Sequence, residues 1–292
     1  MTYGFKSRHP HHVGASFHRL LRFFYHSENV TKEGFAVRII LSPAKQMREE
    51  GDTLAPAGLP QYLAEAGQLA DYLRGLSLEE LRALMGCNEK IAALNWARYQ
   101  QMDLERASTP ALLAYDGIQY QYMAPRVFEG AYYTYVQEHL RILSGLYGVL
   151  RPLDAVTPYR LEMGARLKTP FCRDLYDFWG DKLARAALEG ERVLLDLSSW
   201  EYGKGVARHL PEGVRVVKCV FGERVGEKIV EKSVHVKMAR GEMVRFLAER
   251  GAESPEEAKA FDRLSYHYSP QDSTENRLVF LREEPGQEKK KK

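Results

Sequence analysis

The chain has 292 residues and a formal net charge of +3, with 45% hydrophobic and 28% charged residues. This composition is ordinary for a globular protein, and no segment approaches the roughly 18 apolar residues that a membrane-spanning helix needs. We therefore expect a cytoplasmic protein without membrane contact. A net charge near zero excludes a chain that is basic all over, so an anionic partner would need cations gathered on one face.

The cysteine and histidine pattern gives no metal-ligand spacing. The three cysteines lie far apart along the chain, and the histidines beyond residue 36 lack partners four residues away. We expect free cysteines, no metal site and no cofactor.

The two ends differ from the middle of the chain. Residues 1–36 hold five of the nine histidines and few periodic apolar positions. We expect a disordered extension there, with a metal-binding tract at His9, His11 and His12 as the alternative. Residues 285–292 form a basic tail that we also expect to be disordered. Residues 37–284 are then a single domain.

The first half of this domain predicts one strand followed by helices. The apolar run at 37–41 indicates a buried strand, ended by Ser42 and Pro43. Residues 59–76 have helical spacing with a stop at Gly75. Ser77 and Glu80 have the spacing of a capping box that begins a second helix, and a third follows at 88–102.

The second half alternates strands and helices without a repeat. We predict strands at 111–117, 192–198, 214–223, 227–238 and 277–283, and helices at 131–145, 174–190, 202–210 and 239–251. This order favours an α+β or mixed α/β domain, with a mixed sheet flanked by helices.

Residues 81–98 resemble a helix-hairpin-helix element. Gly86 separates two helices, and Lys90 lies near the start of the second. Such an element binds the nucleic-acid backbone through the amide groups of its turn, the N-terminus of its second helix and a nearby cation. Asn95 and Arg98 would share a helix face. The alternative is two packed helices with an ordinary glycine break.

Residues 143–164 combine leucines, glycines, prolines and arginines. The prolines restrict the backbone of the segment. Such rigidity suits a binding site whose side chains are held in place before the ligand arrives. Arginine suits bidentate recognition of phosphate. Five cations stand against two carboxylates between 141 and 168: Arg141, Arg151, Arg160, Arg166 and Lys168 against Asp154 and Glu162. Alternatively, Arg151 and Arg160 pair internally with Asp154 and Glu162.

Further candidate residues follow predicted strands or lie on a predicted helix. Lys45 comes just after the first strand, where open α/β sheets commonly place ligands. Glu201 and Lys204 follow a later strand and could do acid–base or nucleophilic chemistry. Lys237 and Arg240 are one helical turn apart, which is also the pattern of a solvated helix face.

Several motifs together resemble the YaaA family of peroxide-stress proteins, over about residues 37–282. They are LSPAK at 41–45, LSGLYGVLRPLD at 143–154, PYRLEMG at 158–164, FWGD at 178–181, EYGK at 201–204 and ARGEMVRF at 239–246. The resemblance implies a cytosolic bacterial protein that lowers free iron under peroxide stress. It also implies an α/β fold with a helix-hairpin-helix-like element and binding to duplex or branched DNA, but no established reaction.

The resemblance has local departures. Gln46, Met47 and Arg48 stand where some members have a Thr-Leu-Asp-like stretch, and residues 117–120 read Gly-Ile-Gln-Tyr rather than Gly-Asp-Val-Tyr. The first 36 residues are an addition to the family pattern, consistent with a start codon assigned too far upstream.

Our first hypothesis is a basic cleft that binds DNA largely independently of sequence, because no recognition helix for base edges is evident. We expect a monomer. The candidate DNA-binding residues are Lys45, Lys90, Asn95, Arg98, Arg141, Arg151, Tyr159, Arg160, Arg166, Lys204, Lys237 and Arg240.

Two other hypotheses stay open. One is an enzyme acting on a nucleotide, nucleobase or nucleic acid, with Lys45, Glu201 and Lys204 as candidate catalytic residues. A closed pocket joining Lys45, Tyr159, Arg160 and Glu201 would favour it, whereas a long open groove would favour DNA binding. The other is iron sequestration by a cluster of Asp174, Asp177 and Asp181.

Overall fold

The computed structural model describes residues 36–49 and 54–283. The expected extension at 1–36, with its histidine tract, lies outside these residues except for Ala36, and so does the basic tail at 285–292. The described residues belong to one compact unit. None of the helices described in that unit has the length and apolar character needed to cross a bilayer.

A mixed, mainly parallel sheet organises the unit, with the strand order β11-β12-β9-β8-β1-β5-β6 and with β10 paired to β9. The inner pairings are parallel, whereas β6, β10 and β11 pair antiparallel with their neighbours. The strands are β1 Val37–Leu41, β5 Leu140–Ser144, β6 Gly148–Leu150, β8 Val193–Asp196, β9 Arg215–Val225, β10 Lys228–Val230, β11 Tyr266–Tyr268 and β12 Arg277–Arg282. The predicted mixed α/β fold with a flanked mixed sheet is thus confirmed.

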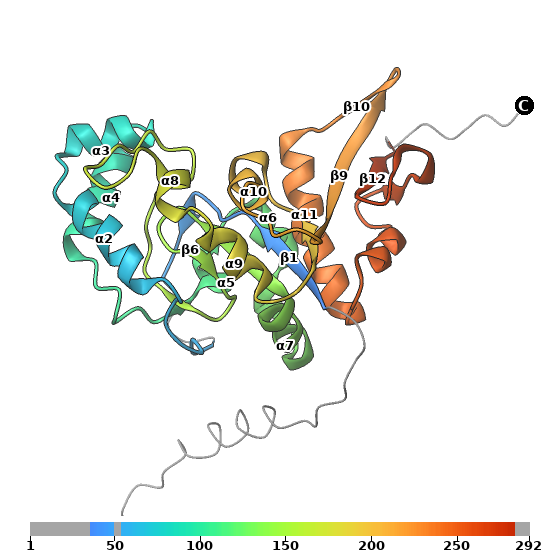
Figure 1. Cartoon of the computed structure of the whole chain (residues 1–292), viewed down its shortest axis with the longest axis horizontal. Coiled ribbons are helices and arrows are strands. Elements are labelled where there is room, and N and C mark those ends of the chain that lie inside the picture. Colours follow the sequence, from blue (N-terminus) through green and yellow to red (C-terminus); the bar gives the residue numbers. More distant parts are fainter. Residues whose placement is uncertain (1–35, 50–53, 284–292) are drawn as a thin grey trace, which may run out of the picture. The chain divides into compact units, whose positions relative to one another are not determined.

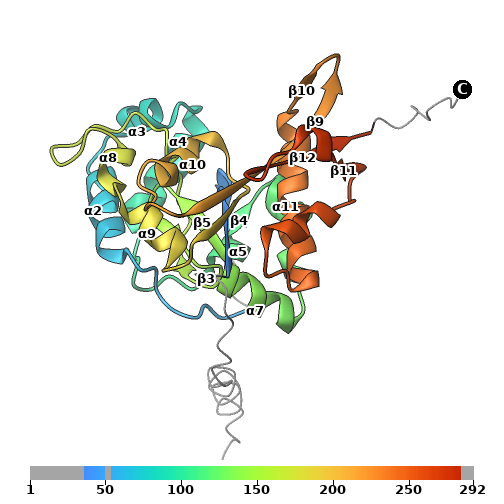
Figure 2. The same ribbon diagram turned by 45° about the vertical axis from the view of Figure 1, so that its right-hand side comes forward.

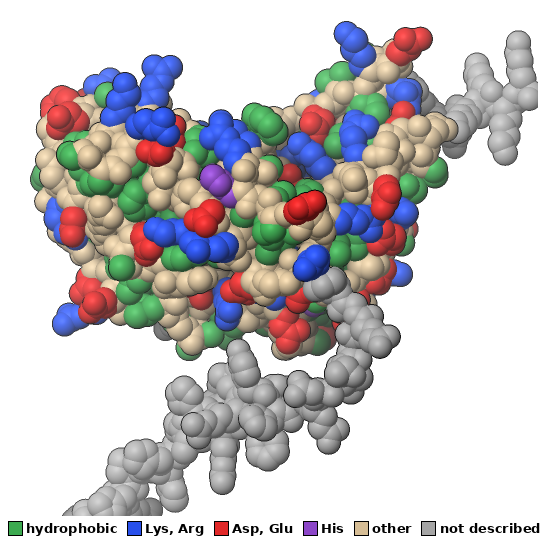
Figure 3. All heavy atoms as spheres, viewed as in Figure 1, with side chains coloured by type: hydrophobic (Ala, Val, Ile, Leu, Met, Phe, Trp, Pro, Cys, Tyr) green, Lys and Arg blue, Asp and Glu red, His purple; other side chains and the backbone are tan. Residues whose placement is uncertain are grey.

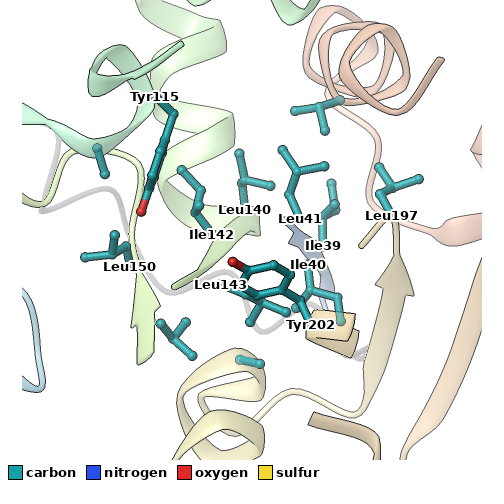
Figure 4. Close-up of a cluster of buried hydrophobic side chains, with 14 of the residues drawn as sticks. Ile39, Ile40, Leu41, Tyr115, Leu140, Ile142, Leu143, Leu150, Leu197 and Tyr202 are labelled. Carbon is teal, nitrogen blue, oxygen red and sulfur yellow. The ribbon is translucent and has the colours of Figure 1, made fainter. Parts of the chain in front are cut away.

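Strand β1 lies at the centre of the sheet, between β5 and β8. Ile39 is in register with Leu140 on one side and Leu195 on the other. A strand covered on both faces reads as a continuous apolar run, which is why residues 37–41 were recognisable in the sequence. Figure 4 shows the aliphatic side chains of β1 and β5 gathered between Tyr115 and Tyr202.

Helices cover both faces of the sheet (Figure 2). Helices α9 (Lys182–Leu188) and α10 (Trp200–Ala207) lie on one face, and α7 (Gly130–His139) and α11 (Ser233–Arg250) lie on the other. Helix α6 (Ile118–Met123) packs closely on α11.

A group of three helices lies on the side of the sheet away from β12 (Figure 1). It consists of α2 (Leu63–Arg74), α3 (Leu78–Met85) and α4 (Glu89–Gln101). The remaining elements are short: β2 Gln46–Met47, β3 Thr109–Pro110, α5 Ala111–Ala114, β4 Tyr115–Asp116, η1 Pro125–Val127, β7 Ala155–Val156, α8 Leu175–Trp179, η2 Pro255–Ala260 and η3 Pro270–Asp272.

The predicted helix boundaries around residue 80 are confirmed. Ser77 and Glu80 form both hydrogen bonds of the capping box at the start of α3. Gly86 ends α3 in the left-handed conformation with φ of 54°, which glycine adopts without steric cost. Asn88 caps α4 through a hydrogen bond from the Ile91 N–H. The structure therefore contains two packed helices joined by a short turn, and a nucleic-acid-binding role for this turn stays a prediction.

Two predicted elements in the middle of the chain are only partly correct. Residues 111–117 were expected to be a strand, but only residues 115–116 form one, β4, and residues 111–114 form the short helix α5 because alanine and leucine are strong helix formers. The predicted helix at 131–145 ends at His139, and residues 140–144 form β5. Pairing with β1 and β6 buries this segment completely, and that tertiary environment overrides its local helical pattern.

Two later predictions are wrong in part. The single helix expected at 174–190 is two helices, because Gly180 between them has a φ of 49° and breaks the first. The strand expected at 227–238 is only Lys228–Val230, because α11 begins at Ser233. The alternating residues 234–238 belong to that helix, whose buried face includes Val236 and Ala239.

Candidate functional site

A pocket of about 520 Å³ opens where β1 and β8 end. Residues 42–46 follow β1 and line it, and Ser199, Glu201 and Tyr202 follow β8 and line it as well. The carboxyl ends of parallel strands meet at one edge of a sheet, which is where ligands bind in open α/β folds. The other walls come from α6, from α11 and from the loop at 159–162.

Charged side chains from five segments converge in this pocket. The cations are Lys45, Arg160, Lys237 and Arg240, and the carboxylates are Asp116, Glu162 and Glu201. The pocket is lined by all four residues whose meeting in a closed pocket would favour the enzyme hypothesis, Lys45, Tyr159, Arg160 and Glu201. Lys204 does not line it. Its amine lies 4.3 Å from the centre of the Tyr176 ring.

Glu162 pairs with two of the four cations. Its carboxylate lies 2.6 Å from the Lys45 amine and 2.9 Å from the Arg160 guanidinium. The Arg160 side chain is only 13% exposed, whereas that of Lys45 is 63% exposed. The alternative interpretation, in which Arg160 pairs internally with Glu162, is thus confirmed, and the three side chains together keep a net charge of only +1.

Ser42 fixes the junction of β1, α6 and α10. Its carbonyl oxygen accepts hydrogen bonds from the Gln119 side chain at 2.8 Å and from the Tyr120 hydroxyl at 3.1 Å. Its hydroxyl oxygen accepts the Ser199 N–H at 2.8 Å. Gln119 lies in the segment that departs from the family pattern, and here it serves to hold the pocket wall.

Tyr159 is a structural part of the pocket floor. Its hydroxyl is hydrogen-bonded to the Tyr115 hydroxyl at 2.8 Å and to the Ser144 hydroxyl at 2.6 Å. Burial raises the pKa of Tyr159, so its hydroxyl stays protonated at neutral pH. The residue can therefore shape the site but does not supply a charge.

Arg240 and Lys237 project from one face of α11. Burial lowers the pKa of Arg240, and its Nε atom is buried without a hydrogen-bond partner among the described residues. Helix α11 comes this close because Gly241 faces α6. A Cβ atom at Gly241 would lie 1.9 Å from the Gln119 carbonyl oxygen.

A second pocket of about 470 Å³ continues from the first. The two share Arg160, Leu161, Glu162 and Glu201, and the second reaches Arg166 and the end of α3 at Gly86. We call the two pockets together the groove. Figure 3 shows the outline of the unit hollowed between the α3 region and the β9–β10 hairpin, with Lys and Arg side chains on both sides.

Arg141 and Arg151 lie at a different place. Arg141 is near the amino end of β5, and Arg151 follows β6, which pairs antiparallel with β5. They line a separate pocket of about 310 Å³ with Asp154 and Glu189. Both guanidinium groups pair with Glu189, which makes the contact that Asp154 was expected to make with Arg151. Asp154 instead accepts the Arg151 backbone N–H at 2.8 Å, and burial raises its pKa to about 6.

The candidates on α4 are spread over different environments. Lys90 is exposed near the start of the helix. Asn95 is only 2% exposed and donates to the Ile91 carbonyl oxygen, so it has no free face for a partner. Arg98 donates to the Met47 carbonyl oxygen at 3.2 Å.

The three aspartates considered for iron are used locally. Asp174 accepts the Asp177 N–H, Asp177 pairs with Arg173, and Asp181 pairs with Arg185. In the part of the chain that the structure describes, no group of three or more His, Cys, Asp or Glu side chains is placed to hold a metal ion.

Sequence reasoning did not include Asp116, Gln119 or Glu162 among the site residues. Asp116 lies in β4, at the end of the strand predicted at 111–117, and Gln119 lies in α6, which was not predicted. The departure from the family pattern at residues 117–120 was the feature of the sequence that could have indicated this wall of the pocket.

The comparison with known families agrees with the motifs. Residues 37–272 match the family model described as peroxide stress protein YaaA. The chain belongs to this family. Its relatives include UPF0246 proteins of Desulfitobacterium hafniense and Lachnoclostridium phytofermentans, which are 52% and 49% identical to it. The first alignment covers 84% of this chain and 98% of the relative, and the second covers 85% and 97%.

Proposed function

We propose that this YaaA-family protein binds the phosphate backbone of DNA in the groove, largely independently of sequence. The binding would be part of a cytoplasmic response to peroxide stress that lowers free iron and limits oxidative damage. Membership of the family supports the role in peroxide stress, and the resemblance to its motifs suggests the link to iron. The cations that line the groove support the proposal of DNA binding.

The observation that carries the DNA-binding proposal is the gathering of distant cations along one continuous groove. Lys45 follows β1, Arg160 and Arg166 come from the loop after β7, and Lys237 and Arg240 come from α11. The groove ends at the turn between α3 and α4, next to the predicted hairpin. A row of cations that meets phosphates positions DNA without reading its sequence.

The test is equilibrium binding of a fluorescent DNA duplex, followed by anisotropy, for the wild-type protein and Lys237→Gln. Lys237 is exposed and unpaired among the described residues, so its loss should weaken binding to unrelated sequences equally. The salt slope should become shallower by about one unit. Lys259→Gln is the matched control, because Lys259 is exposed on η2 and does not line the groove. Equal losses in both variants would reject the groove as the DNA site.

One observation favours an enzyme as the second candidate. Lys45, Tyr159, Arg160 and Glu201 share one pocket, which was the arrangement expected for catalysis on a nucleotide or nucleic acid. Glu201 accepts the Gly164 N–H at 2.7 Å, and this bond fixes its carboxylate at the pocket wall. Mass spectrometry of nucleotides and oligonucleotides incubated with the protein would test this. Turnover that Glu201→Gln abolishes would support catalysis.

A further inference from the structure

The cations of the first pocket that have no ion-pair partner among the described residues lie on its α11 side. Lys237 and Arg240 form no ion pair or hydrogen bond with any residue that the structure describes. Asp196 and Glu231 act on Arg240 only through space. A guanidinium removed from water without acceptors is unfavourable, so this arrangement favours an anionic ligand.

The carboxylates of the pocket are engaged elsewhere. Glu162 holds Lys45 and Arg160, and Glu201 accepts the Gly164 N–H. Asp116 accepts the Gln121 side-chain N–H at 3.4 Å and lies 3.8 Å from Arg48. None of the three is paired with Lys237 or Arg240, and an incoming anion would meet two cations without displacing an internal carboxylate.

A neutral donor lies in the same pocket. The Ser42 hydroxyl donates to the Ser199 Oγ atom at 3.2 Å, which leaves the Ser199 hydroxyl proton without an acceptor among the described residues. Ser199 lines the pocket together with Arg240. The site thus offers a guanidinium, an amine and a hydroxyl to one ligand.

We propose that this subsite, made by Arg240, Lys237 and Ser199, binds a phosphomonoester dianion. Two cations without a direct ion pair suit the charge of about −2 that a terminal phosphate carries at neutral pH, whereas an internal phosphodiester carries only one charge. An arginine fork also suits several phosphate oxygens at once. The subsite rests on the proposed function, since it gives the groove a preference for phosphorylated strand ends.

Two kinds of ligand carry such a phosphomonoester dianion. One is the end of a nucleic-acid strand, and such ends arise when a sugar–phosphate chain is broken by hydrolysis or by oxidation of the sugar. The other is a free mononucleotide. Both present the same dianion, and they differ in whether the rest of the groove is also filled.

The experiment compares short fluorescent duplexes that are identical except for phosphate or hydroxyl groups at their ends. AMP and adenosine serve as the mononucleotide probes. We expect phosphorylated ends to bind about ten-fold tighter, as charge-assisted hydrogen bonds typically give. The preference should grow as pH rises through about 6, where the phosphate gains its second charge.

Variants separate the subsite from the rest of the groove. Arg240→Met and the exposed Lys237→Gln should each remove the preference for phosphorylated ends. Arg166→Gln, at the other end of the groove, should weaken both duplexes equally and keep the preference. The Lys237 variant keeps the test decisive if the Arg240 variant does not fold.

The outcomes distinguish this inference from the proposed function. Equal binding of phosphorylated and hydroxyl ends by the wild-type protein would overturn the subsite and leave DNA binding intact. Preference for AMP over adenosine without DNA binding would support the subsite and overturn the proposed function. Failure of all probes to bind would overturn both.

Discussion

The charged form of the Asp154 carboxylate is destabilised by its buried environment. Asp154 is only 7% exposed, and burial raises its pKa from an ordinary 3.8 to about 6 despite the nearby Arg151 and Arg141. Because the folded state keeps this proton where the unfolded chain has lost it, stability falls as pH rises through this interval. Above about pH 6 the Asp154 carboxylate is charged in the folded protein, and the full free-energy cost of burying that charge then lowers the stability.

Asp154→Asn should therefore flatten the dependence of stability on pH. The amide oxygen can still accept the Arg151 N–H, while the buried charge is gone. Between pH 4 and pH 7 the free energy of unfolding of the wild-type protein should fall relative to the variant by on the order of 2 kcal/mol. Urea titrations at each pH measure this difference, and parallel curves for the two proteins would contradict the expectation.

The ion pairs show which contacts a sequence can reveal. The Arg160–Glu162 pair joins residues two apart, and their proximity in the sequence was sufficient to suggest it. Glu189, the residue that follows α9, pairs with Arg141 and Arg151 although it lies 48 and 38 residues further along the chain. That pairing depends on how α9 packs against the sheet, which local spacing does not encode.

At the scale of elements, Gly241 controls how closely α11 approaches α6. An added Cβ would lie 1.9 Å from the Gln119 carbonyl oxygen and 3.0 Å from the Met123 nitrogen, both of which are backbone atoms. Neither atom can move without displacing α6, which carries a wall of the groove. The contact thus links helix packing to the position of Arg240.

Gly241→Ala should destabilise the protein by about 1 to 3 kcal/mol, the usual cost of overpacking. It should also weaken DNA binding, because α11 and α6 move apart at the groove. Gly67→Ala is the control, since Gly67 lies within α2 and an added Cβ meets nothing within 4 Å. That change should stabilise the protein by about 0.5 to 1 kcal/mol. Similar melting temperatures for the two variants would argue against this packing contact.

The turn between α3 and α4 is tested by Lys90→Glu. The side chain is exposed near the start of α4, so its replacement should leave the melting temperature nearly unchanged. If the turn grips the DNA backbone, reversing this charge should weaken duplex binding several-fold. Duplex affinity equal to that of the wild-type protein would make the two helices a purely structural pair.

Element prediction succeeded where local chemistry determines the boundary. The capping box at Ser77 and the left-handed Gly86 are local, and both were read correctly. Residues 140–144 become β5 because they fill the position beside β1, although their sequence continues the helical pattern of α7. Helix α6 was not predicted, and a wall of the site was missed with it.

At the scale of the molecule, the groove is a product of topology. Parallel strands β1 and β8 deliver Lys45 and Glu201 to the same edge of the sheet, and α11 brings Lys237 and Arg240 to that edge. The sequence indicated these residues singly, but their convergence depends on the strand order. Arg141 and Arg151 came from the same basic segment and yet lie in another pocket, because they sit toward the amino end of β5.

The central claim is that unpaired cations brought together in the groove bind a polyanion, and the salt dependence of duplex binding tests it most directly. Lys45 and Arg160 are already paired with Glu162, which leaves Arg166, Lys237 and Arg240 as the groove cations that have no ion pair among the described residues. The logarithm of the association constant should fall with the logarithm of salt concentration at a slope of about −3. The double variant Arg166→Gln, Lys237→Gln should bring the slope to about −1. A wild-type affinity that does not change with salt would contradict the claim.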